Sequence, residues 1–101
     1  MIQVTIKKDP YTITVSGHAN YDKSGKDIVC SSVSTAVILS SNLIERFGDS
    51  EFVEVKVSDG YFKLVVNYFT QPIKTILDNL VWTLEELKKQ YPKYIKIKKE
   101  G

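Results

Sequence analysis

The chain has 101 residues, a net charge of +2 and a single cysteine. This length suits one domain, so we expect a single domain over residues 1–101. A hydrophobic fraction of 43% and a charged fraction of 26% are typical of globular proteins and argue against extensive disorder. One cysteine excludes an internal disulfide, and no signal peptide is evident. No stretch approaches the roughly 18 apolar residues of a membrane helix, so we expect a soluble cytoplasmic protein without membrane contact.

The first 27 residues predict a hairpin followed by a loop. Apolar side chains alternate over residues 2–7 and again over 11–15, on either side of the turn signal at 8–10. Such alternation is typical of two half-buried strands joined by a tight turn. Residues 19–27 are polar and show no apolar period, which predicts a loop.

Residues 28–47 repeat apolar and small side chains at steps of three and four, which predicts a helix. Gly48 follows directly, as a glycine often follows the end of a helix. This helix has unusually small side chains, among them Ser31, Ser32 and Ala36. We expect another element, a strand, to approach it closely.

The second half of the chain also predicts two strands followed by a helix, although no internal repeat is evident in the sequence. Residues 52–57 and 61–69 predict two strands joined by the turn Asp59-Gly60, a strong two-residue hairpin signal. A helix then begins after Thr70 and ends before Pro92, and residues 94–97 predict a short last strand. The order β-β-α-β-β-α-β predicts a small α+β sandwich, with two helices on an antiparallel or mixed sheet.

The basic residues are concentrated near the end of the chain, at Lys93, Lys96, Lys98 and Lys99. A lysine-rich end is most often a solvated sheet edge. Contact with RNA or the ribosome is the functional alternative, and aromatic residues in the second hairpin could stack bases.

The only histidine, His18, and the only cysteine, Cys30, lie on either side of the predicted loop. If Asp27 caps the helix, Cys30 lies in its first turn, where free N–H groups and the helix dipole favour a thiolate. A cysteine and histidine within hydrogen-bond reach can carry out covalent acyl transfer. A buried inert thiol in an interaction module is the alternative, and one Cys with one His supplies too few ligands for a structural zinc site.

The sequence around these two residues resembles the signature of a known family. It reads Gly17-His18-Ala19-x-Tyr21-x-x-x-Gly25-x-Asp27-Ile28-Val29-Cys30, followed by Val33-Ser34. This run is similar to the motif of the ribosomal-processing cysteine protease family, called Prp. The family commonly has two alanines after the cysteine, where this chain has Ser31 and Ser32.

The resemblance implies a homodimeric bacterial protease without a cofactor. It implies that the chain removes the N-terminal extension of large-subunit ribosomal protein twenty-seven, cutting the precursor after an aromatic pair. By position, the nucleophile falls on Cys30 and the general base on His18, and the other motif residues fall on Gly17, Asp27 and Ser34. A non-enzymatic ribosome- or RNA-associated protein is the alternative.

The resemblance also implies that the loop over residues 19–26 moves when substrate binds, with Ala19, Asn20, Tyr21, Asp22 and Gly25 among its members. No third residue that orients His18 can be identified, and Asn20, Asp22 and Asp27 are the candidates. An apolar groove for the aromatic side chains is expected, to which Tyr21, Tyr61 or Tyr68 contributes.

Overall fold

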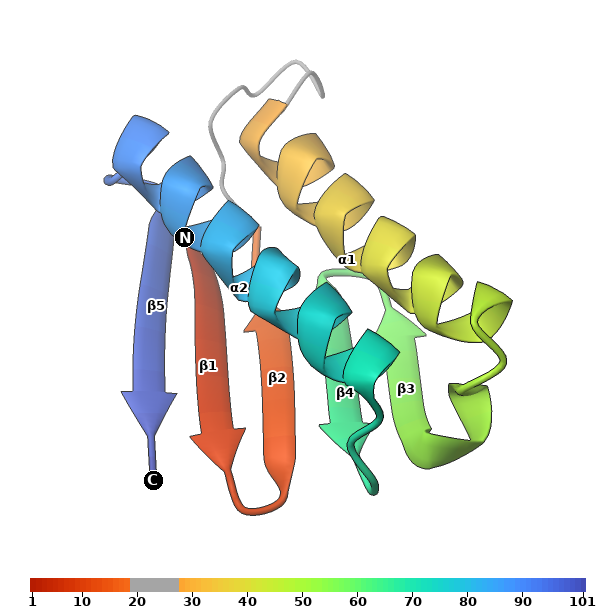
Figure 1. Cartoon of the computed structure of the whole chain (residues 1–101). Coiled ribbons are helices and arrows are strands. Elements are labelled where there is room, and N and C mark those ends of the chain that lie inside the picture. Colours follow the sequence, from red (N-terminus) through yellow and green to blue (C-terminus); the bar gives the residue numbers. More distant parts are fainter. Residues whose placement is uncertain (19–27) are drawn as a thin grey trace.

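The computed structural model describes residues 1–18 and 28–101. In these residues, two helices cover one face of a five-stranded sheet (Figure 1). The strands are β1 (Ile2–Lys8), β2 (Tyr11–Ser16), β3 (Val53–Ser58), β4 (Tyr61–Val66) and β5 (Ile95–Glu100), and the helices are α1 (Ile28–Arg46) and α2 (Gln71–Gln90). The predicted α+β class and the order of elements are therefore confirmed.

The strand order in the sheet is β3-β4-β2-β1-β5. The pairs β1–β2, β2–β4 and β3–β4 are antiparallel, whereas β1 and β5 are parallel. The sheet is thus mixed. Both predicted hairpins form, and the β2–β4 pairing joins them, which brings the end of β2 beside the turn between β3 and β4.

One hydrophobic core lies between the sheet and the helices. Alternate residues of the central strands face it, as in β1, where Ile2, Val4 and Ile6 are buried. The helices contribute stripes at helical spacing, such as Val29, Val33, Val37, Ser40 and Ile44 of α1. On α2 the hydroxyl oxygen of Thr70 accepts a hydrogen bond from the Ile73 N–H at 3.2 Å, so the predicted N-cap is confirmed.

The structure corrects one packing expectation. The small side chains of α1 face α2, not a strand: Ser32 and Ala36 line a shallow groove between the helices together with Thr83 of α2. Small residues allow two helices to approach closely. The predicted strand β3 forms, and all of its residues are at least partly exposed, Val57 to 67%, because β3 lies at the edge of the sheet.

Helix α1 has 19 residues and a mean hydropathy of 1.5 over its most apolar 18-residue window, so by length and composition alone it could span a membrane. The expectation that no segment comes near this limit was therefore wrong for this helix. Core helices of globular proteins pass the same test, and Val29, Val33 and Ile44 of α1 lie in the core.

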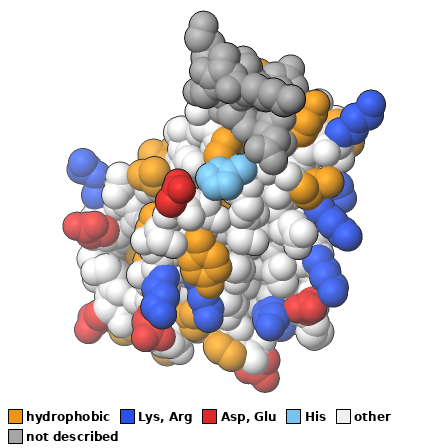
Figure 2. All heavy atoms as spheres, turned by 180° about the vertical axis from the view of Figure 1, so that it is seen from behind, with side chains coloured by type: hydrophobic (Ala, Val, Ile, Leu, Met, Phe, Trp, Pro, Cys, Tyr) orange, Lys and Arg blue, Asp and Glu red, His pale blue; other side chains and the backbone are white. Residues whose placement is uncertain are grey.

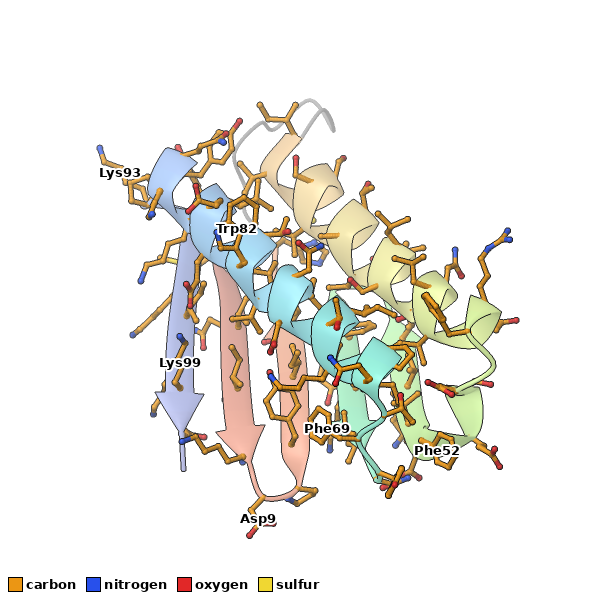
Figure 3. All side chains as sticks on the ribbon, in the orientation of Figure 1. Asp9, Phe52, Phe69, Trp82, Lys93 and Lys99 are labelled. Carbon is orange, nitrogen blue, oxygen red and sulfur yellow. The ribbon has the colours of Figure 1, made fainter. Side chains whose placement is uncertain are left out.

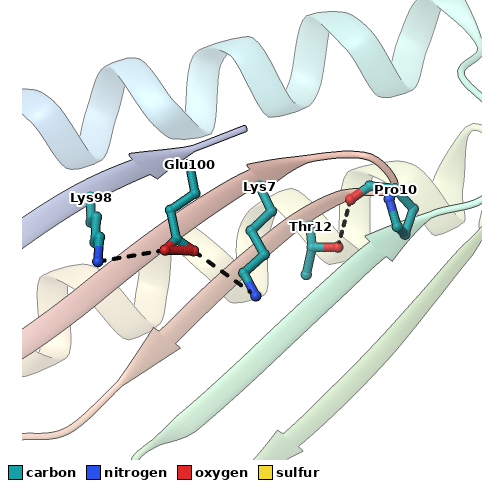
Figure 4. A network of polar contacts seen from close by, with 5 residues as sticks. All are labelled: Lys7, Pro10, Thr12, Lys98 and Glu100. Carbon is teal, nitrogen blue, oxygen red and sulfur yellow. Dashed lines mark hydrogen bonds and ion pairs between the residues drawn. The ribbon is translucent and has the colours of Figure 1, made fainter.

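The lysine-rich end of the chain forms the edge strand β5. Lys99 pairs with Glu85 of α2 at 2.7 Å, and the Glu100 carboxylate lies 3.5 Å from Lys98 and 3.9 Å from Lys7 (Figure 4). Exposed ion pairs of this kind contribute little to stability. They agree with the solvated-edge interpretation of this segment, since lysines discourage unwanted strand pairing.

Tyr11 packs edge-on against Phe69 with ring centroids 5.3 Å apart. Phe69 lies just before the start of α2 (Figure 3). Burial, and secondarily the charge of Asp78, raise the pKa of Tyr11 above its ordinary value of 10.0. The folded state therefore favours the neutral phenol. The neutral Tyr11 phenol therefore contributes to the free energy of unfolding. This contribution is complete below pH 10.0 and is lost as the pH rises through the raised pKa.

We expect Tyr11→Phe to flatten the decline of the free energy of unfolding at alkaline pH. Urea unfolding of the unmodified protein and the variant between pH 8 and pH 11 measures this decline. Tyr68→Phe is the control, because Tyr68 is 63% exposed. The same alkaline decline in the unmodified protein and in Tyr11→Phe would contradict the prediction.

Candidate active site

A cavity of about 150 Å³ opens where the start of α1 meets the end of β2 and the β3–β4 turn. It brings together residues that are far apart in the sequence. Its polar wall consists of Gly17, His18, Cys30, Ser34, Ser58, Asp59, Gly60 and Tyr61. Both reactive residues predicted from the sequence therefore line the same cavity.

Cys30 is the third residue of α1 and is partly buried against the core. The first turn of a helix has backbone N–H groups without partners inside the helix, and it is the positive end of the helix dipole. Ser34 lies one turn further along α1 and also lines the cavity. The thiol and the hydroxyl thus lie on the same side of the helix.

His18 follows β2 and is exposed at the mouth of the cavity. Viewed from the side opposite the helices, its ring lies at the surface beside an acidic side chain (Figure 2). Backbone contacts hold this segment: the Gly17 N–H donates to the Gly60 carbonyl oxygen at 2.9 Å, and the Met1 amino group donates to the His18 carbonyl oxygen.

Gly17 has to be a glycine for two physical reasons. Its φ of +95° lies in a region that L side chains rarely adopt, and a Cβ there would collide with the Met1 carbonyl oxygen. A larger residue would therefore displace the chain directly before His18. This accounts for the glycine in the motif through backbone geometry.

The imidazole of His18 also lies against Gly60, in the turn between β3 and β4. A Cβ at Gly60 would lie 2.7 Å from Nε2 of His18 and 3.2 Å from Cε1. The ring therefore lies directly against the backbone of the β3–β4 turn. The sequence indicated Gly60 only as a turn residue, and its contact with His18 depends on the β2–β4 pairing.

The structure also shows which acidic and aromatic residues lie near the site. Asp59 lines the cavity, although its sequence context indicated only a turn. The predicted partners of His18, namely Asn20, Asp22 and Asp27, lie outside the described residues, as does the rest of the predicted loop. Tyr61 lines the cavity, whereas Tyr68 packs against Phe52 at a ring distance of 5.4 Å.

The remaining walls of the cavity are apolar. They consist of Ile2, Val15, Val33, Val37, Ile38, Val57 and Phe62. The site therefore combines a thiol and an imidazole with an apolar surface. In residues 1–18 and 28–101, no three His, Cys, Asp or Glu side chains gather closely enough to hold a metal ion.

The model of the family described as cysteine protease Prp matches residues 1–96. The chain belongs to this family. It is 24% identical to the ribosomal processing cysteine protease Prp of Bacillus subtilis, with 96% of each chain covered. As a member of the Prp family it is a cysteine protease, a hydrolase of peptide bonds, which confirms the enzymatic interpretation over the non-enzymatic alternative.

Solved structures of similar proteins agree with the fold. The Prp protease of S. aureus, in complex with a covalently linked product peptide, matches with a TM-score of 0.86 and 25% identity. That match covers 98% of this chain and 99% of the S. aureus chain. SMU.848 from Streptococcus mutans matches with a TM-score of 0.75 and 26% identity over 99% of this chain and 94% of its own.

Proposed function

We propose that Cys30 is the nucleophile of this Prp protease and that His18 is its general base. The observation that carries the proposal is that both side chains line one cavity, although they come from different elements. The cavity also has an apolar wall suited to a peptide side chain. A cysteine and a histidine that share a cleft have the minimal equipment for acyl transfer.

The mechanism is thiol proteolysis. His18 accepts the proton of the Cys30 thiol, and the sulfur attacks the scissile carbonyl carbon. Backbone N–H groups at the start of α1 stabilise the oxyanion of the tetrahedral intermediate. As the C–N bond breaks, His18 gives the proton to the leaving amine, and a thioester remains on Cys30. Water, deprotonated by His18, then hydrolyses the thioester and restores the thiol.

We further propose that Gly17, Ser34 and Asp27 support this pair. Gly17 sets the backbone path before His18, as its positive φ and its contact with Met1 support. Ser34 shares the cavity with Cys30 and is placed to hydrogen-bond to groups beside the sulfur. For Asp27, which lies outside the described residues, the role is a helix cap at the start of α1.

The substrate that we propose is the precursor of large-subunit ribosomal protein twenty-seven, cut after an aromatic pair in its N-terminal extension. The B. subtilis relative is named a ribosomal processing protease, which supports this class of substrate. The apolar cavity wall supports the aromatic preference, because a cavity of about 150 Å³ can hold one benzene ring. A cytoplasmic location follows from this substrate.

The test is incubation of the reduced protein with a peptide that spans the extension and its aromatic pair, read by mass spectrometry. We expect a single cut after the pair. Protein alkylated with iodoacetamide is the control, since Cys30 is the only cysteine and its modification removes the nucleophile. A folded, reduced protein that leaves the peptide intact would contradict the proposal.

Gly60→Ala should reduce cleavage about a hundredfold, because the new Cβ displaces the imidazole of His18. Gly48→Ala is a matched control: Gly48 also has a positive φ, of 78°, but nothing lies within 4 Å of its Cβ position. Both variants should lose about 1–2 kcal/mol of stability from the left-handed backbone. Equal kcat/KM in the two variants would show that Gly60 does not position His18.

We propose a homodimer that forms through the outer face of the helices. Leu39 and Leu43 of α1, together with Phe47 directly after its end, follow one another at four-residue spacing and are 58%, 37% and 60% exposed. Trp82 on α2 is also 60% exposed (Figure 3). Exposed apolar residues in such number are typical of an interface. Leu39→Glu should shift sedimentation toward the monomer, and a monomeric unmodified protein would contradict the proposal.

A further inference from the structure

The edge strand β3 lies directly beside the catalytic cavity. Val57 and Ser58 of β3 line that cavity together with His18 and Cys30. Further along the strand, Val53 and Val55 line a second hollow with Ser41 and other residues of α1. The two hollows lie one after the other between β3 and α1, and we call this strip, lined by Val53, Val55 and Val57, the seam. Figure 1 shows α1 on the same side of the sheet as the seam.

Among residues 1–18 and 28–101, no strand pairs with β3 on the side away from β4. The Asn67 N–H donates to the Phe52 carbonyl oxygen at 2.8 Å, which makes these two residues a hydrogen-bonded pair of the antiparallel ladder. Hydrogen-bonded and non-hydrogen-bonded pairs alternate in such a ladder. The N–H and C=O groups of Val55 and Val57 therefore point outward from the sheet. At Val53 only the C=O is left for a partner, because the Val53 N–H donates to the Ser50 carbonyl oxygen.

The side chains of the same three residues point toward α1, so one strip offers both hydrogen bonds and apolar contact. Val55 and Val57 are 42% and 67% exposed, and Ile38 on the facing helix is 54% exposed. The strip from Val53 to Val57 is about 13 Å long, which matches about five residues of an extended peptide.

The two edges of the sheet differ in a way that indicates a use for β3. The other edge strand, β5, carries Lys96, Lys98 and Lys99, the kind of charge that keeps foreign strands away from an edge. On β3 the charged residues Glu54 and Lys56 lie on the open face of the sheet with Lys63, away from the α1 seam. The side chains of β3 that face α1 are therefore uncharged.

We propose that the peptide substrate binds as an added strand on the free edge of β3, with alternate side chains in the seam beside α1. The proposal rests on the proposed protease function. Strand addition uses main-chain hydrogen bonds for affinity and pockets for alternate side chains for specificity. The continuity of the seam with the cavity favours the substrate over a second copy of the chain as the occupant.

Val55→Pro tests the outward hydrogen bonds. Proline removes the Val55 N–H without breaking a bond to β4, and edge strands tolerate proline when the N–H faces solvent. We expect kcat/KM for the extension peptide to fall roughly three- to tenfold, the effect of one lost hydrogen bond. Lys56→Thr, on the open face of the same strand, is the control and should retain normal cleavage.

Two further readouts separate binding from damage to the fold or to the nucleophile. The alkylation rate of Cys30 and the thermal unfolding midpoint of Val55→Pro should stay close to those of the unmodified protein. If Val55→Pro cleaves the peptide normally but loses the dimer in sedimentation, the edge belongs to a second copy and the proposal is wrong.

Substrate peptides with single N-methylated amides provide a test on the unmodified enzyme, which decides the matter even if Val55→Pro does not fold. We expect cleavage to fall at every second position on one side of the scissile bond, since alternate amides face β3. Losses without alternation would overturn the added strand while leaving the protease function intact. Failure to cleave the unmethylated peptide would instead overturn the proposed function.

Discussion

Cys30→Ala is expected to lower kcat/KM for the extension peptide by more than about 10⁴-fold, because no other nucleophile replaces the sulfur. The result of this variant has a single interpretation, since the chain contains no second thiol that could act in place of Cys30. Cleavage followed by mass spectrometry measures the loss. The fold should remain, because alanine fits where the partly buried cysteine packs.

Ser31→Ala is the matched control for this variant. Ser31 is the neighbouring residue of α1, is exposed, and lines the groove toward α2 rather than the catalytic cavity. We expect its cleavage rate to equal that of the unmodified protein. Residual cleavage by Cys30→Ala at a comparable rate would show that the nucleophile is another residue.

His18→Ala should lower kcat/KM by at least about 10³-fold, because the thiol loses its proton acceptor and the leaving amine loses its proton donor. The variant should also react with iodoacetamide about tenfold more slowly than the unmodified protein, since no imidazole accepts the thiol proton as the sulfur attacks. The alkylation rate requires no peptide, so it tests the pairing of His18 with Cys30 independently of substrate choice.

Added imidazole distinguishes the proposed role of His18 from a structural one. The truncated side chain leaves space at the exposed mouth of the cavity, so free imidazole should restore part of the activity of His18→Ala. The same imidazole should have no effect on Cys30→Ala. If His18→Ala alkylates at the normal rate and imidazole restores nothing, His18 does not act as the base.

Local patterns of the sequence predicted most elements because each pattern depends on neighbouring residues only. The alternation of Ile2, Val4 and Ile6 predicted β1 and its buried face correctly. The same alternation in β3 predicted the strand but not its exposure, because Val55 and Val57 lie on an edge strand beside a seam. Burial depends on what covers a strand, which its own sequence does not state.

For the candidate site, the motif from Gly17 to Ser34 pointed to the cavity residues that lie close to one another in the sequence. It could not indicate Asp59 or Gly60, whose local signal is only that of a tight turn. Those two residues reach the cavity because β2 pairs with β4. That pairing is non-local and depends on the packing of the whole sheet.

The sequence by itself therefore determined the type and order of the elements and the family, and it predicted Cys30 and His18 as the reactive pair, since periodicity, turn residues and a spaced motif are local properties. Only the tertiary structure decided that β1 and β5 pair in parallel, that α1 packs against α2, and that the β3–β4 turn contacts His18. It also decided that β3 is an edge strand of the described sheet and lies beside the cavity. These features arise from contacts between residues far apart in the chain, which are set by the packing of one shared core.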